Sequence, residues 1–456
     1  MSGTAFTALD LHSALLKNLE VLGYLSMTPI QSRSLPPMLD GRDLIGQAKT
    51  GSGKTAAFGL ALLQKLDVRR FHIQSLVLCP TRELADQVAA EIRRLGQQMP
   101  NMKVLTLCGG APIGPQIGSL EHGAHIIVGT PGRVEDHLRR GTLSLPGVST
   151  LVLDEADRML EMGFQESLEA IFAQLPSQRQ TLMFSATFGR EVKATAERIM
   201  QDPVFVEVGE AHDKSSIDEH FYRVADDGER LTVLRLLLQQ VRPASALVFC
   251  ATRRDVDEVA AGLRRHDFSA LPLHGDMDQK DRDRTLVRFA NNSVSVLVAS
   301  DVAARGLDIG GLDLVVNYHV ARDPDTHLHR VGRTGRAGAS GMACTLFEGR
   351  EEQRVRRLAP DFVDEAWPPM ALLEAKTPWP EMVTLQVDGG KRQKLRPGDI
   401  VGALTGDGGI PGERIGKILV TDVRAYVAVG HDVARAALKQ LGEGRMKGRS
   451  FRVRQL

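Results

Sequence analysis

The chain is poor in cysteine, with four among its 456 residues. None of them forms the C-x-x-C pair of a structural zinc site, and their wide spacing argues against a disulfide framework. We therefore expect buried free thiols and a reducing compartment. The four are Cys79, Cys108, Cys250 and Cys344.

Long apolar runs are also missing. No stretch approaches the roughly 18 apolar residues of a membrane-spanning helix. The first residues lack the basic and then apolar regions of a secretion signal. Heptads, low-complexity tracts and repeats with a period of about 20–50 residues are absent as well. We expect a cytoplasmic protein with no membrane partner and, as its oligomeric state, a monomer.

What is present is an ordinary globular composition with an uneven charge. The chain is 43% hydrophobic and 25% charged, and its length predicts about three domains. Residues 381–456 hold 14 Lys and Arg against 8 Asp and Glu, a net charge of +6 in a chain whose total is +1. This asymmetry indicates a polyanionic partner for the tail, the alternative being a solvated basic face.

Apolar runs and amphipathic stretches, such as Glu83–Gln97, alternate between residues 40 and 190. After a polar stretch at Gly209–Ser216 the alternation starts again. The pattern predicts two doubly wound α/β lobes in tandem, with sites at the carboxyl ends of their sheets facing a cleft. The expected strands are Ser75–Cys79, His125–Val128, Thr150–Leu153, Thr181–Phe184, Ala246–Cys250, Ala270–Leu273, Val294–Ala299, Leu312–Asn317 and Met342–Phe347.

Four prolines and both tryptophans lie in Trp367–Pro380, which is too rich in proline to continue a helix or sheet. The residues beyond it predict a β-α-β-β-α-β unit. Its expected strands are Val383–Val387, Ile415–Leu419, Tyr426–Val429 and Phe451–Arg454, and its helices Pro397–Leu404 and Val433–Leu441. We divide the chain into domains at residues 1–209, 210–366 and 382–456, with a linker at 367–381.

The stretch Ala48–Thr55, AKTGSGKT, predicts a phosphate-binding loop. Its glycines let several backbone N–H groups converge on one anion at a helix N-terminus. Lys54 would reach the β and γ phosphates, and the Thr55 hydroxyl would bind Mg²⁺. Ala48 stands where the usual pattern has glycine, and a plain strand-to-helix turn is the alternative.

An acidic cluster, Asp154-Glu155-Ala156-Asp157, follows the strand Thr150–Leu153. Asp154 is the expected Mg²⁺ ligand, partly through water, and Glu155 the general base that polarises the attacking water. Capping of the following helix is the alternative. The hydroxyls of Ser185-Ala186-Thr187 either bond to this cluster or form an ordinary ST-turn, and the sequence leaves both open.

Two basic motifs stand in the second lobe. His329–Arg336, HRVGRTGR, is either a solvated loop or an anion clamp in which Arg333 and Arg336 act as arginine fingers. In the stretch at 301–308, Asp308 could accept from ribose hydroxyls, and Arg305 and Gly306 could meet a phosphate backbone.

Together these motifs resemble the DEAD-box family of ATP-dependent RNA helicases over residues 6 to about 350. Further matches are PTRELA at 80–85, Gly109-Gly110, TPGR at 130–133 and ARGLD at 304–308. The resemblance implies two tandem RecA-like doubly wound domains, with ATP and Mg²⁺ as cofactors and RNA as partner. It also implies local strand separation, in which ATP and RNA close the lobes and hydrolysis reopens them.

The resemblance also assigns residues to sites. In GYLSMTPIQ, at 23–31, the Gln31 amide would read adenine, with Phe6 stacking nearby. The catalytic set is Lys54, Asp154, Glu155, His329, Arg333 and Arg336, with Thr55 and Asp154 at the metal. The nucleotide set is Phe6, Tyr24, Thr28, Gln31, Ala48, Thr50, Gly51, Ser52, Gly53, Lys54, Thr55, Gly306 and Asp308. The RNA backbone set is Pro80, Thr81, Arg82, Gly110, Thr130, Arg133, Gly275, Gln279, Arg282 and Arg305.

The tail looks like an RRM-type fold, a small α+β RNA-binding domain, with one aromatic residue in its third strand. Binding through loops and the basic rim is thus favoured over stacking on the sheet face. The expected RNA contacts are Lys391, Arg392, Lys394, Arg424, Tyr426 and Arg449. Residues 398–410 and 416–429 resemble the DbpA group of bacterial DEAD-box proteins, which implies a hairpin of large-subunit (23S) ribosomal RNA near the peptidyl-transferase centre as target, and pre-ribosomal particles as partners. A protein or another structured RNA is the alternative.

Three functions stay open on the sequence. The first is an RNA-dependent ATPase that remodels ribosomal RNA during large-subunit assembly. The second is an ATP-gated RNA clamp, for which strand separation is incidental. The third, which the motifs disfavour, is a DNA translocase on the same two-lobe plan.

Overall fold

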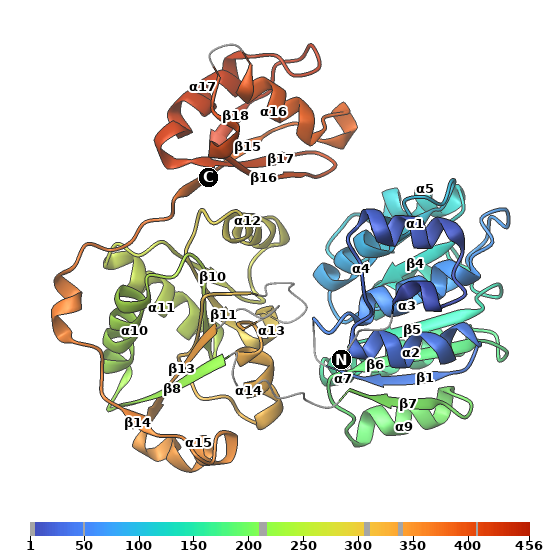
Figure 1. Cartoon of the computed structure of the whole chain (residues 1–456), viewed down its shortest axis with the longest axis horizontal. Coiled ribbons are helices and arrows are strands. Elements are labelled where there is room, and N and C mark those ends of the chain that lie inside the picture. Colours follow the sequence, from blue (N-terminus) through green and yellow to red (C-terminus); the bar gives the residue numbers. More distant parts are fainter. Residues whose placement is uncertain (1–4, 49–50, 209–216, 305–310, 336–340, 407–408) are drawn as a thin grey trace. The chain divides into compact units, whose positions relative to one another are not determined.

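The structure is a computed structural model that describes residues 5–48, 51–208, 217–304, 311–335, 341–406 and 409–456. The chain forms two compact units, one made mainly of residues 1–213 and the other mainly of residues 214–456. The first unit contains one β-sheet and the second contains two (Figure 1). Within the described residues, no helix is long and apolar enough to cross a membrane.

The first sheet has seven parallel strands in the order β3-β4-β2-β5-β6-β1-β7. Helices connect the strands and cover both faces of the sheet (Figure 1). The strands are β1 (Leu44–Gln47), β2 (Ser75–Leu78), β3 (Val104–Leu107), β4 (Ile126–Gly129), β5 (Thr150–Asp154), β6 (Gln180–Ser185) and β7 (Val204–Glu207). The α-helices are α1 (Ser13–Val21), α2 (Pro29–Leu39), α3 (Lys54–Lys65), α4 (Arg82–Leu95), α5 (Ile113–Glu121), α6 (Pro131–Arg139), α7 (Ala156–Glu161), α8 (Gln165–Phe172) and α9 (Arg190–Ile199).

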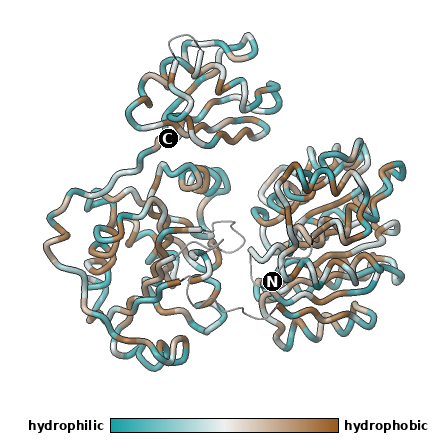
Figure 2. Tube along the Cα trace, viewed as in Figure 1, coloured by the Kyte–Doolittle hydropathy of each residue, from teal (hydrophilic) through white to brown (hydrophobic). Residues whose placement is uncertain are grey.

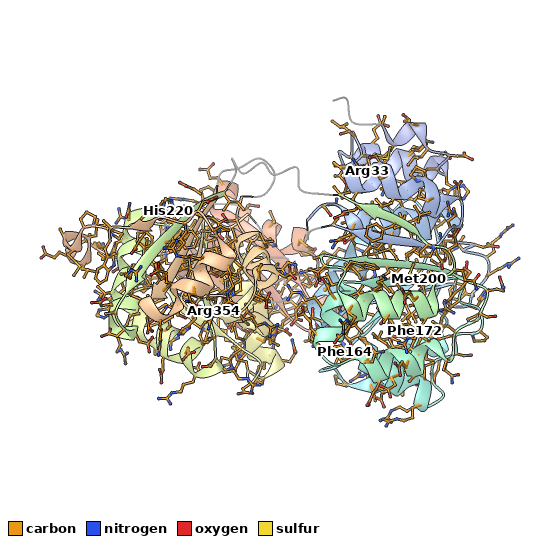
Figure 3. The ribbon with its side chains drawn as sticks, turned by 90° about the horizontal axis from the view of Figure 1, so that it is seen from below. Arg33, Phe164, Phe172, Met200, His220 and Arg354 are labelled. Atoms are coloured by element: carbon orange, nitrogen blue, oxygen red, sulfur yellow. The ribbon has the colours of Figure 1, made fainter. Side chains whose placement is uncertain are left out.

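Apolar side chains fill both faces of this sheet. Figure 2 colours the chain by the hydropathy of each residue. Alternate strand residues belong to two separate clusters, because successive side chains of a strand point to opposite faces. Phe164, Phe172 and Met200, labelled in Figure 3, pack into one of them. This two-sided burial is why the inner strands read as unbroken apolar runs in the sequence.

The second sheet has the order β10-β11-β9-β12-β13-β8-β14, and its strand pairs are parallel. Its strands are β8 (Ile217–Val224), β9 (Ala246–Cys250), β10 (Ala270–Leu273), β11 (Val296–Ser300), β12 (Leu314–Asn317), β13 (Gly341–Glu348) and β14 (Asp364–Glu365). Its helices are α10 (Asp227–Val241), α11 (Arg253–Arg265), α12 (Gln279–Ala290), α13 (Asp301–Ala304), α14 (Pro324–Val331) and α15 (Glu352–Leu358).

A buried arginine on α10 joins several parts of the second sheet. The Arg230 side chain is 1% exposed, and its Nη1 donates to the backbone oxygens of Tyr318 and Leu346 at 2.6 and 3.0 Å. Its Nη2 donates to the carboxylates of Glu348 and Glu351. Although burial opposes ionisation, Arg230 holds the pKa of Glu348 below its usual range. The guanidinium thus links α10 to the ends of two strands.

The segment Trp367–Pro380, the linker segment, runs along the helices of the second sheet. Trp367 Nε1 donates to the backbone oxygen of Arg223 at 2.8 Å. Farther on, Gln239 Nε2 donates to the backbone oxygen of Ala375 at 3.1 Å. A short 3₁₀ turn, η3 (Met370–Glu374), lies between these contacts. The linker segment therefore has defined hydrogen bonds along its length.

The third sheet is antiparallel, in the order β16-β17-β15-β18. Its strands are β15 (Met382–Val387), β16 (Ile415–Val420), β17 (Ala425–Gly430) and β18 (Val453–Gln455), and its helices α16 (Pro397–Thr405) and α17 (Ala434–Glu443). Apolar residues of both helices pack with alternate residues of the strands into one core. The observed order is the β-α-β-β-α-β order expected from the sequence.

Candidate functional site

The order of strands in the first sheet divides its carboxyl edge into two halves. β5, β6 and β1 are neighbours, and they are followed by the acidic cluster, the Ser185-Ala186-Thr187 turn and the phosphate loop. β3, β4 and β2 make up the other half, and the residues assigned to RNA in this lobe follow them. Since all these strands are parallel, their carboxyl ends meet at one edge.

The phosphate loop runs into α3, whose first two residues are Lys54 and Thr55. Gly51 and Gly53 have φ angles of +84° and +96°, which favour glycine. Lys54 is 6% exposed, and its Nζ donates to the backbone oxygen of Ala48 at 2.8 Å. Ser52 and the half-buried Thr55 flank these residues. The ammonium group is thus held against the loop that it is expected to serve, at the positive end of a helix.

Gln31 lies directly against the same loop. Its Nε2 donates to the backbone oxygen of Gly53 at 3.1 Å, and its Oε1 accepts from the Thr28 N–H at 2.8 Å. A Cβ at residue 53 would lie 2.5 Å from Gln31 Nε2, so the close approach requires glycine there. An amide can make up to four hydrogen bonds, which leaves capacity for an adenine edge.

Two aromatic residues of the nucleotide set lie together at the start of the chain. Phe6 is 3% exposed, and its ring meets that of Tyr24 edge-on, with centroids 6.3 Å apart. The Tyr24 hydroxyl donates to Glu91 at 2.8 Å. Burial, together with Glu91, raises the pKa of Tyr24. The pair packs on the core that includes α2 and α3.

Asp154 ends β5 and has the properties of a cation ligand. It is 3% exposed, and its Oδ1 is buried without a hydrogen-bond partner among the described residues. Burial raises the pKa of Asp154 to about 7, with Lys54 opposing the effect and Glu155 adding to it. An unpartnered, buried carboxylate oxygen at the end of a strand fits Mg²⁺, which prefers oxygen ligands.

Glu155 follows with a left-handed backbone, φ +54° and ψ +54°, and is 7% exposed. Left-handed conformations are uncommon for residues with a side chain and cluster at functional sites. The turn separates Asp154, at the strand end, from α7, which begins at Ala156.

The sequence left open whether Ser185-Ala186-Thr187 bonds to the acidic cluster or forms an ordinary ST-turn. The hydrogen bonds of Asp157 show that it bonds to the cluster. Asp157 Oδ2 accepts from the Ala186 and Thr187 N–H groups at 3.2 and 2.9 Å, and from the Thr187 hydroxyl at 3.0 Å. Although burial opposes ionisation, these bonds and the Lys54 charge hold the pKa of Asp157 below its usual range. The two motifs are therefore joined by hydrogen bonds.

The second half of the edge carries the residues assigned to RNA. Pro80 follows β2, Thr81 caps α4 by accepting from the Leu84 N–H, and Arg82 begins that helix. Gly110, with φ +73°, follows β3. After β4, Thr130 precedes α6, which carries Arg133.

Arg133 ties two of these loops together. Its Nη1 donates to the backbone oxygen of Ala111 at 3.1 Å and to Gln116 Oε1 at 3.0 Å. His137, one turn along α6, contacts the same Gln116 oxygen at 2.9 Å. Gln116 was not singled out in the sequence, and nothing in its local sequence marks it.

In the second unit, residues of the RNA set follow the edge strand β10. Gly275 lies in the turn after it, and Gln279 begins α12. Arg282 Nη2 donates to the backbone oxygen of Ala303, on the helix that follows β11, at 2.9 Å. Thr50, Arg305, Gly306, Asp308 and Arg336 lie outside the described residues.

The basic motif after β12 is anchored by an arginine that the sequence did not assign. Arg330 is 3% exposed and donates to both carboxylate oxygens of Asp301 at 2.7 and 2.8 Å. Its Nη1 also donates to Asn317 and to the backbone oxygen of His319. This bidentate pair ties α14 to the end of β11. His329 lies beside it on α14, and Arg333, 5% exposed, follows the helix.

Four tail residues gather at one end of the third sheet. The N–H groups of Lys391 and Arg392 donate to backbone oxygens in the turn at 421–424, at 2.9 and 3.0 Å. Lys394 ends the same short loop. Arg424 ends the facing turn, directly before β17. The loop and the turn thus bring these basic side chains to the same rim.

The other two tail residues differ in their surroundings. Tyr426, in β17, is 5% exposed. Arg449 lies in the turn after α17, where its N–H and that of Met446 bond to each other's carbonyl groups. The burial of the Tyr426 ring favours contacts through the basic rim over stacking on this tyrosine.

Models of three families match the chain in sequence. They are a DEAD/DEAH box helicase domain at residues 28–195, a helicase conserved C-terminal domain at 229–338 and a DbpA RNA binding domain at 384–455. The ATP-dependent RNA helicase DbpA of Escherichia coli is 52% identical, over 99% of this chain and 100% of its own length. The chain belongs to the DEAD-box family of ATP-dependent RNA helicases.

Other DEAD-box proteins match the two parallel sheets. The DEAD-box ATP-dependent RNA helicase CshA of Geobacillus kaustophilus is 42% identical, over 80% of each chain. Among solved structures, Dbp5 of S. cerevisiae bound to RNA and ADP BeF3 is 30% identical, with a TM-score of 0.71, over 79% of this chain and 95% of that one. The two sheets are thus the tandem RecA-like domains of a DEAD-box helicase, and the third belongs to an RNA-binding domain of the DbpA type. The chain is an ATP-dependent RNA helicase, and RNA is its partner.

Proposed function

We propose that this helicase remodels large-subunit (23S) ribosomal RNA in pre-ribosomal particles, in the cytoplasm. The observation that supports the proposal is the DbpA-type RNA-binding domain at residues 384–455, on a chain that matches E. coli DbpA over 99% of its length. That domain would hold a hairpin near the peptidyl-transferase centre while the core acts on neighbouring helices. Four buried free cysteines suit a reducing compartment.

The nucleotide site would lie on the β5-β6-β1 half of the first edge. Lys54 and the loop N–H groups would bind the β and γ phosphates, and the Gln31 amide would read adenine. Glu155 would take the proton of the attacking water. Asp154 and Thr55 would hold Mg²⁺, which would neutralise phosphate charge; the orphan Oδ1 of Asp154 supports this placement.

The second lobe would complete the reaction by supplying arginine fingers, Arg333 and Arg336, to the γ-phosphate. His329 would support them, Gly306 and Asp308 would meet the nucleotide, and catalysis would depend on closure of the lobes. The domains would span residues 1–209, 210–366 and 382–456, with the linker at 367–381.

RNA would be held by its phosphates and sugars. Backbone contacts from both lobes carry no sequence information, so the choice of target would fall to the tail. The proposed tail contacts are those of the basic rim, Lys391, Arg392, Lys394 and Arg424, with Tyr426 and Arg449.

Replacing the loop lysine tests the nucleotide site. Lys54→Ala removes the cation for the β and γ phosphates, so we expect ATP hydrolysis to fall to background in a steady-state phosphate-release assay. The matched control is Lys193→Ala, which removes an exposed lysine on α9 of the same lobe and should leave turnover unchanged. Thermal unfolding should show both variants folded. Turnover in Lys54→Ala equal to that of the control would falsify the site.

Replacing the proposed base separates hydrolysis from binding. We expect Glu155→Gln to keep ATP-dependent RNA binding, measured by fluorescence anisotropy, and to lose turnover, because the amide cannot accept the proton of water. Normal subunit assembly in cells that carry only Glu155→Gln would show that closure on RNA, and not hydrolysis, is the function.

A further inference from the structure

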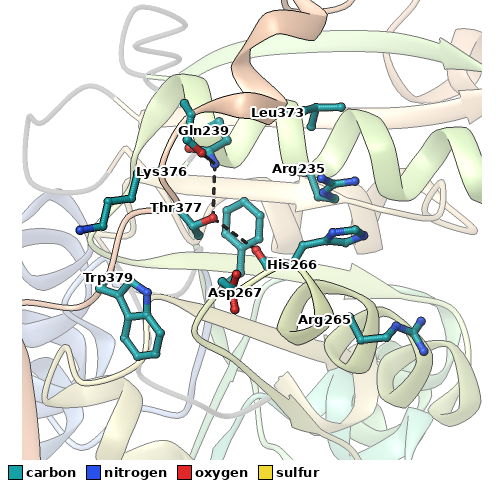
Figure 4. A pocket seen from close by; sticks show the side chains of 11 residues that line it. Arg235, Gln239, Arg265, His266, Asp267, Leu373, Lys376, Thr377 and Trp379 are labelled. Atoms are coloured by element: carbon teal, nitrogen blue, oxygen red, sulfur yellow. Dashed lines mark hydrogen bonds between the residues drawn. The ribbon is translucent and has the colours of Figure 1, made fainter.

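A pocket of about 420 Å³ lies between the linker segment and the helices of the second sheet, and none of its lining residues belongs to the motifs described above. One wall comes from Arg235 and Gln239 on α10 and from Arg265 at the end of α11. The other wall comes from the linker segment, with Lys376 and Trp379 (Figure 4). The volume is in the range of pockets that take one small ligand, such as a nucleotide.

Hydrogen bonds fix the linker wall of the pocket. Gln239 Nε2 donates to the backbone oxygen of Ala375 at 3.1 Å and contacts Thr377 Oγ1 at 3.5 Å. The Thr377 hydroxyl donates to the backbone oxygen of His266 at 3.3 Å, and Arg242 Nη2 to that of Lys376 at 3.1 Å. The wall is thus a built surface, as the dashed lines in Figure 4 show for Gln239 and Thr377.

The pocket is lined by three cationic side chains and one acidic residue, Asp267. The cations come from three elements, Arg235 from α10, Arg265 from α11 and Lys376 from the linker segment. Burial and the charges of the two arginines lower the pKa of His266, which shares the pocket. This local excess of positive charge suits an anion, and the planar guanidinium of arginine matches the geometry of a nucleic-acid phosphate.

Two further groups indicate a base as well as a phosphate. Gln239 is 6% exposed, and its Oε1 is buried without a hydrogen-bond partner among the described residues. An amide oxygen in this state accepts from a donor such as a base N–H. Trp379 is 63% exposed, and an open indole on a cationic wall is a stacking platform for single-stranded bases.

We propose that this pocket binds a nucleotide of single-stranded RNA that flanks the RNA held by the tail domain. Trp379 stands only three residues before β15, the first strand of that domain, so the pocket and the tail domain adjoin along the chain. The proposal rests on the family's RNA binding and not on the identity of the ribosomal target. Trp379 would stack on the base, Gln239 would accept from it, and the cations would meet the flanking phosphates.

Fluorescence of Trp379 tests the proposal directly. Trp367→Phe leaves Trp379 as the sole tryptophan of the full chain. We expect a ten-nucleotide oligouridylate, added without ATP, to quench its emission saturably, because a base stacked on indole quenches it. Trp379→Ala in the otherwise unchanged chain should weaken binding of the same oligonucleotide about 10-fold. No quenching, or equal affinity for the Trp379→Ala chain, would overturn the proposal.

Two matched triple variants distinguish binding at this pocket from a general effect of the protein's net charge. Arg235→Gln, Arg265→Gln and Lys376→Gln together should weaken oligouridylate binding at least 5-fold, and should lower the salt slope by about 0.7 for each lost phosphate contact. The control removes the same charge from the exposed face of α15, at Arg354, Arg356 and Arg357; Figure 3 labels the first of these. Equal weakening in both triples would show that only net charge matters.

A mononucleotide distinguishes the strand from a free ligand. Uridine monophosphate should quench Trp379 only at concentrations at least 100-fold above those of the oligonucleotide, because it lacks the flanking phosphates. Equal potency of the two would overturn the assignment to an RNA strand. Loss of ribosomal RNA preference would leave these results unchanged, since oligouridylate contains no ribosomal sequence.

Discussion

At the scale of single residues, the acidic cluster shows how environment assigns roles to the same side chain. Asp154 and Asp157 stand three residues apart and are both buried. Asp154 has an oxygen without a partner, and burial raises its pKa to about 7. Asp157 accepts three hydrogen bonds from residues 186 and 187, and its pKa is lowered. The first carboxylate suits a cation and the second suits a structural link.

The link at Asp157 has a defined pH dependence. Its folded-state pKa is below the unfolded value of about 3.9, so it adds stability above that pH, and the gain is lost as pH falls through the folded pKa. We expect Asp157→Asn to lower the unfolding free energy of the first unit by about 1–3 kcal/mol at pH 7. The deficit should shrink below about pH 4.

Hydrogen exchange of the β6 amide groups, at pH 7 and below about pH 4, measures the unfolding free energy around the Asp157 link. The control is Asp136→Asn, at a partly exposed aspartate of α6 that pairs with the exposed Arg139, and it should change β6 little. A deficit for Asp157→Asn that is as large at low pH as at pH 7 would contradict the account.

At the scale of elements, the buried Arg230 is the contact on which α10 most depends. Arg230→Met removes the buried guanidinium that pairs with the partly buried Glu348 and Glu351 and leaves backbone oxygens without their donor, so we expect a loss of about 3–5 kcal/mol in the unfolding free energy of the second unit. Both tryptophans lie in that unit, so their fluorescence in urea reports its unfolding. The control is Arg356→Met, an exposed partner of Glu352, which should cost less than about 1 kcal/mol. Equal losses would refute the role of Arg230.

The inner strands were predictable because burial on both faces leaves an apolar run in the sequence. β9 and β10 have the predicted bounds, and β2, β5 and β6 differ by one residue at one or both ends. β1 was missed because Gly46 and Gln47 interrupt its apolar run; a Cβ at residue 46 would lie 2.6 Å from the Phe184 ring. β8 was missed because several of its residues are polar, and His220 pairs with Glu365 of β14 across the sheet.

The place of a site residue in the fold was predictable where one motif carries it: Lys54 begins α3 and Asp154 ends β5. Contacts between motifs were at most one alternative, as for Ser185-Ala186-Thr187 and the acidic cluster, because they depend on which strands become neighbours. The bonds from Thr187 to Asp157 and from Arg330 to Asp301 each join residues 29 or more positions apart. The only sequence signals for these two contacts were charged or hydroxyl residues at the ends of predicted strands.

At the scale of the whole molecule, the chain combines two RecA-like domains, which we propose contact only the RNA backbone, with a basic tail of net charge +6 at residues 381–456. If target choice lies in the tail, its removal should leave catalysis intact but indifferent to RNA identity. We expect a chain without residues 381–456 to hydrolyse ATP with equal stimulation by ribosomal RNA and by a generic strand. A truncated chain that still prefers ribosomal RNA would place specificity in the core.

The most direct test of the central claim is the ATPase rate of the full chain with total ribosomal RNA, compared with an equal mass of unstructured homopolymer. The backbone contacts that we propose for the core carry no sequence information, so we attribute a preference for ribosomal RNA to the tail domain. The account predicts much stronger stimulation by ribosomal RNA, at a lower half-saturating concentration. Equal stimulation by the two RNAs would contradict it.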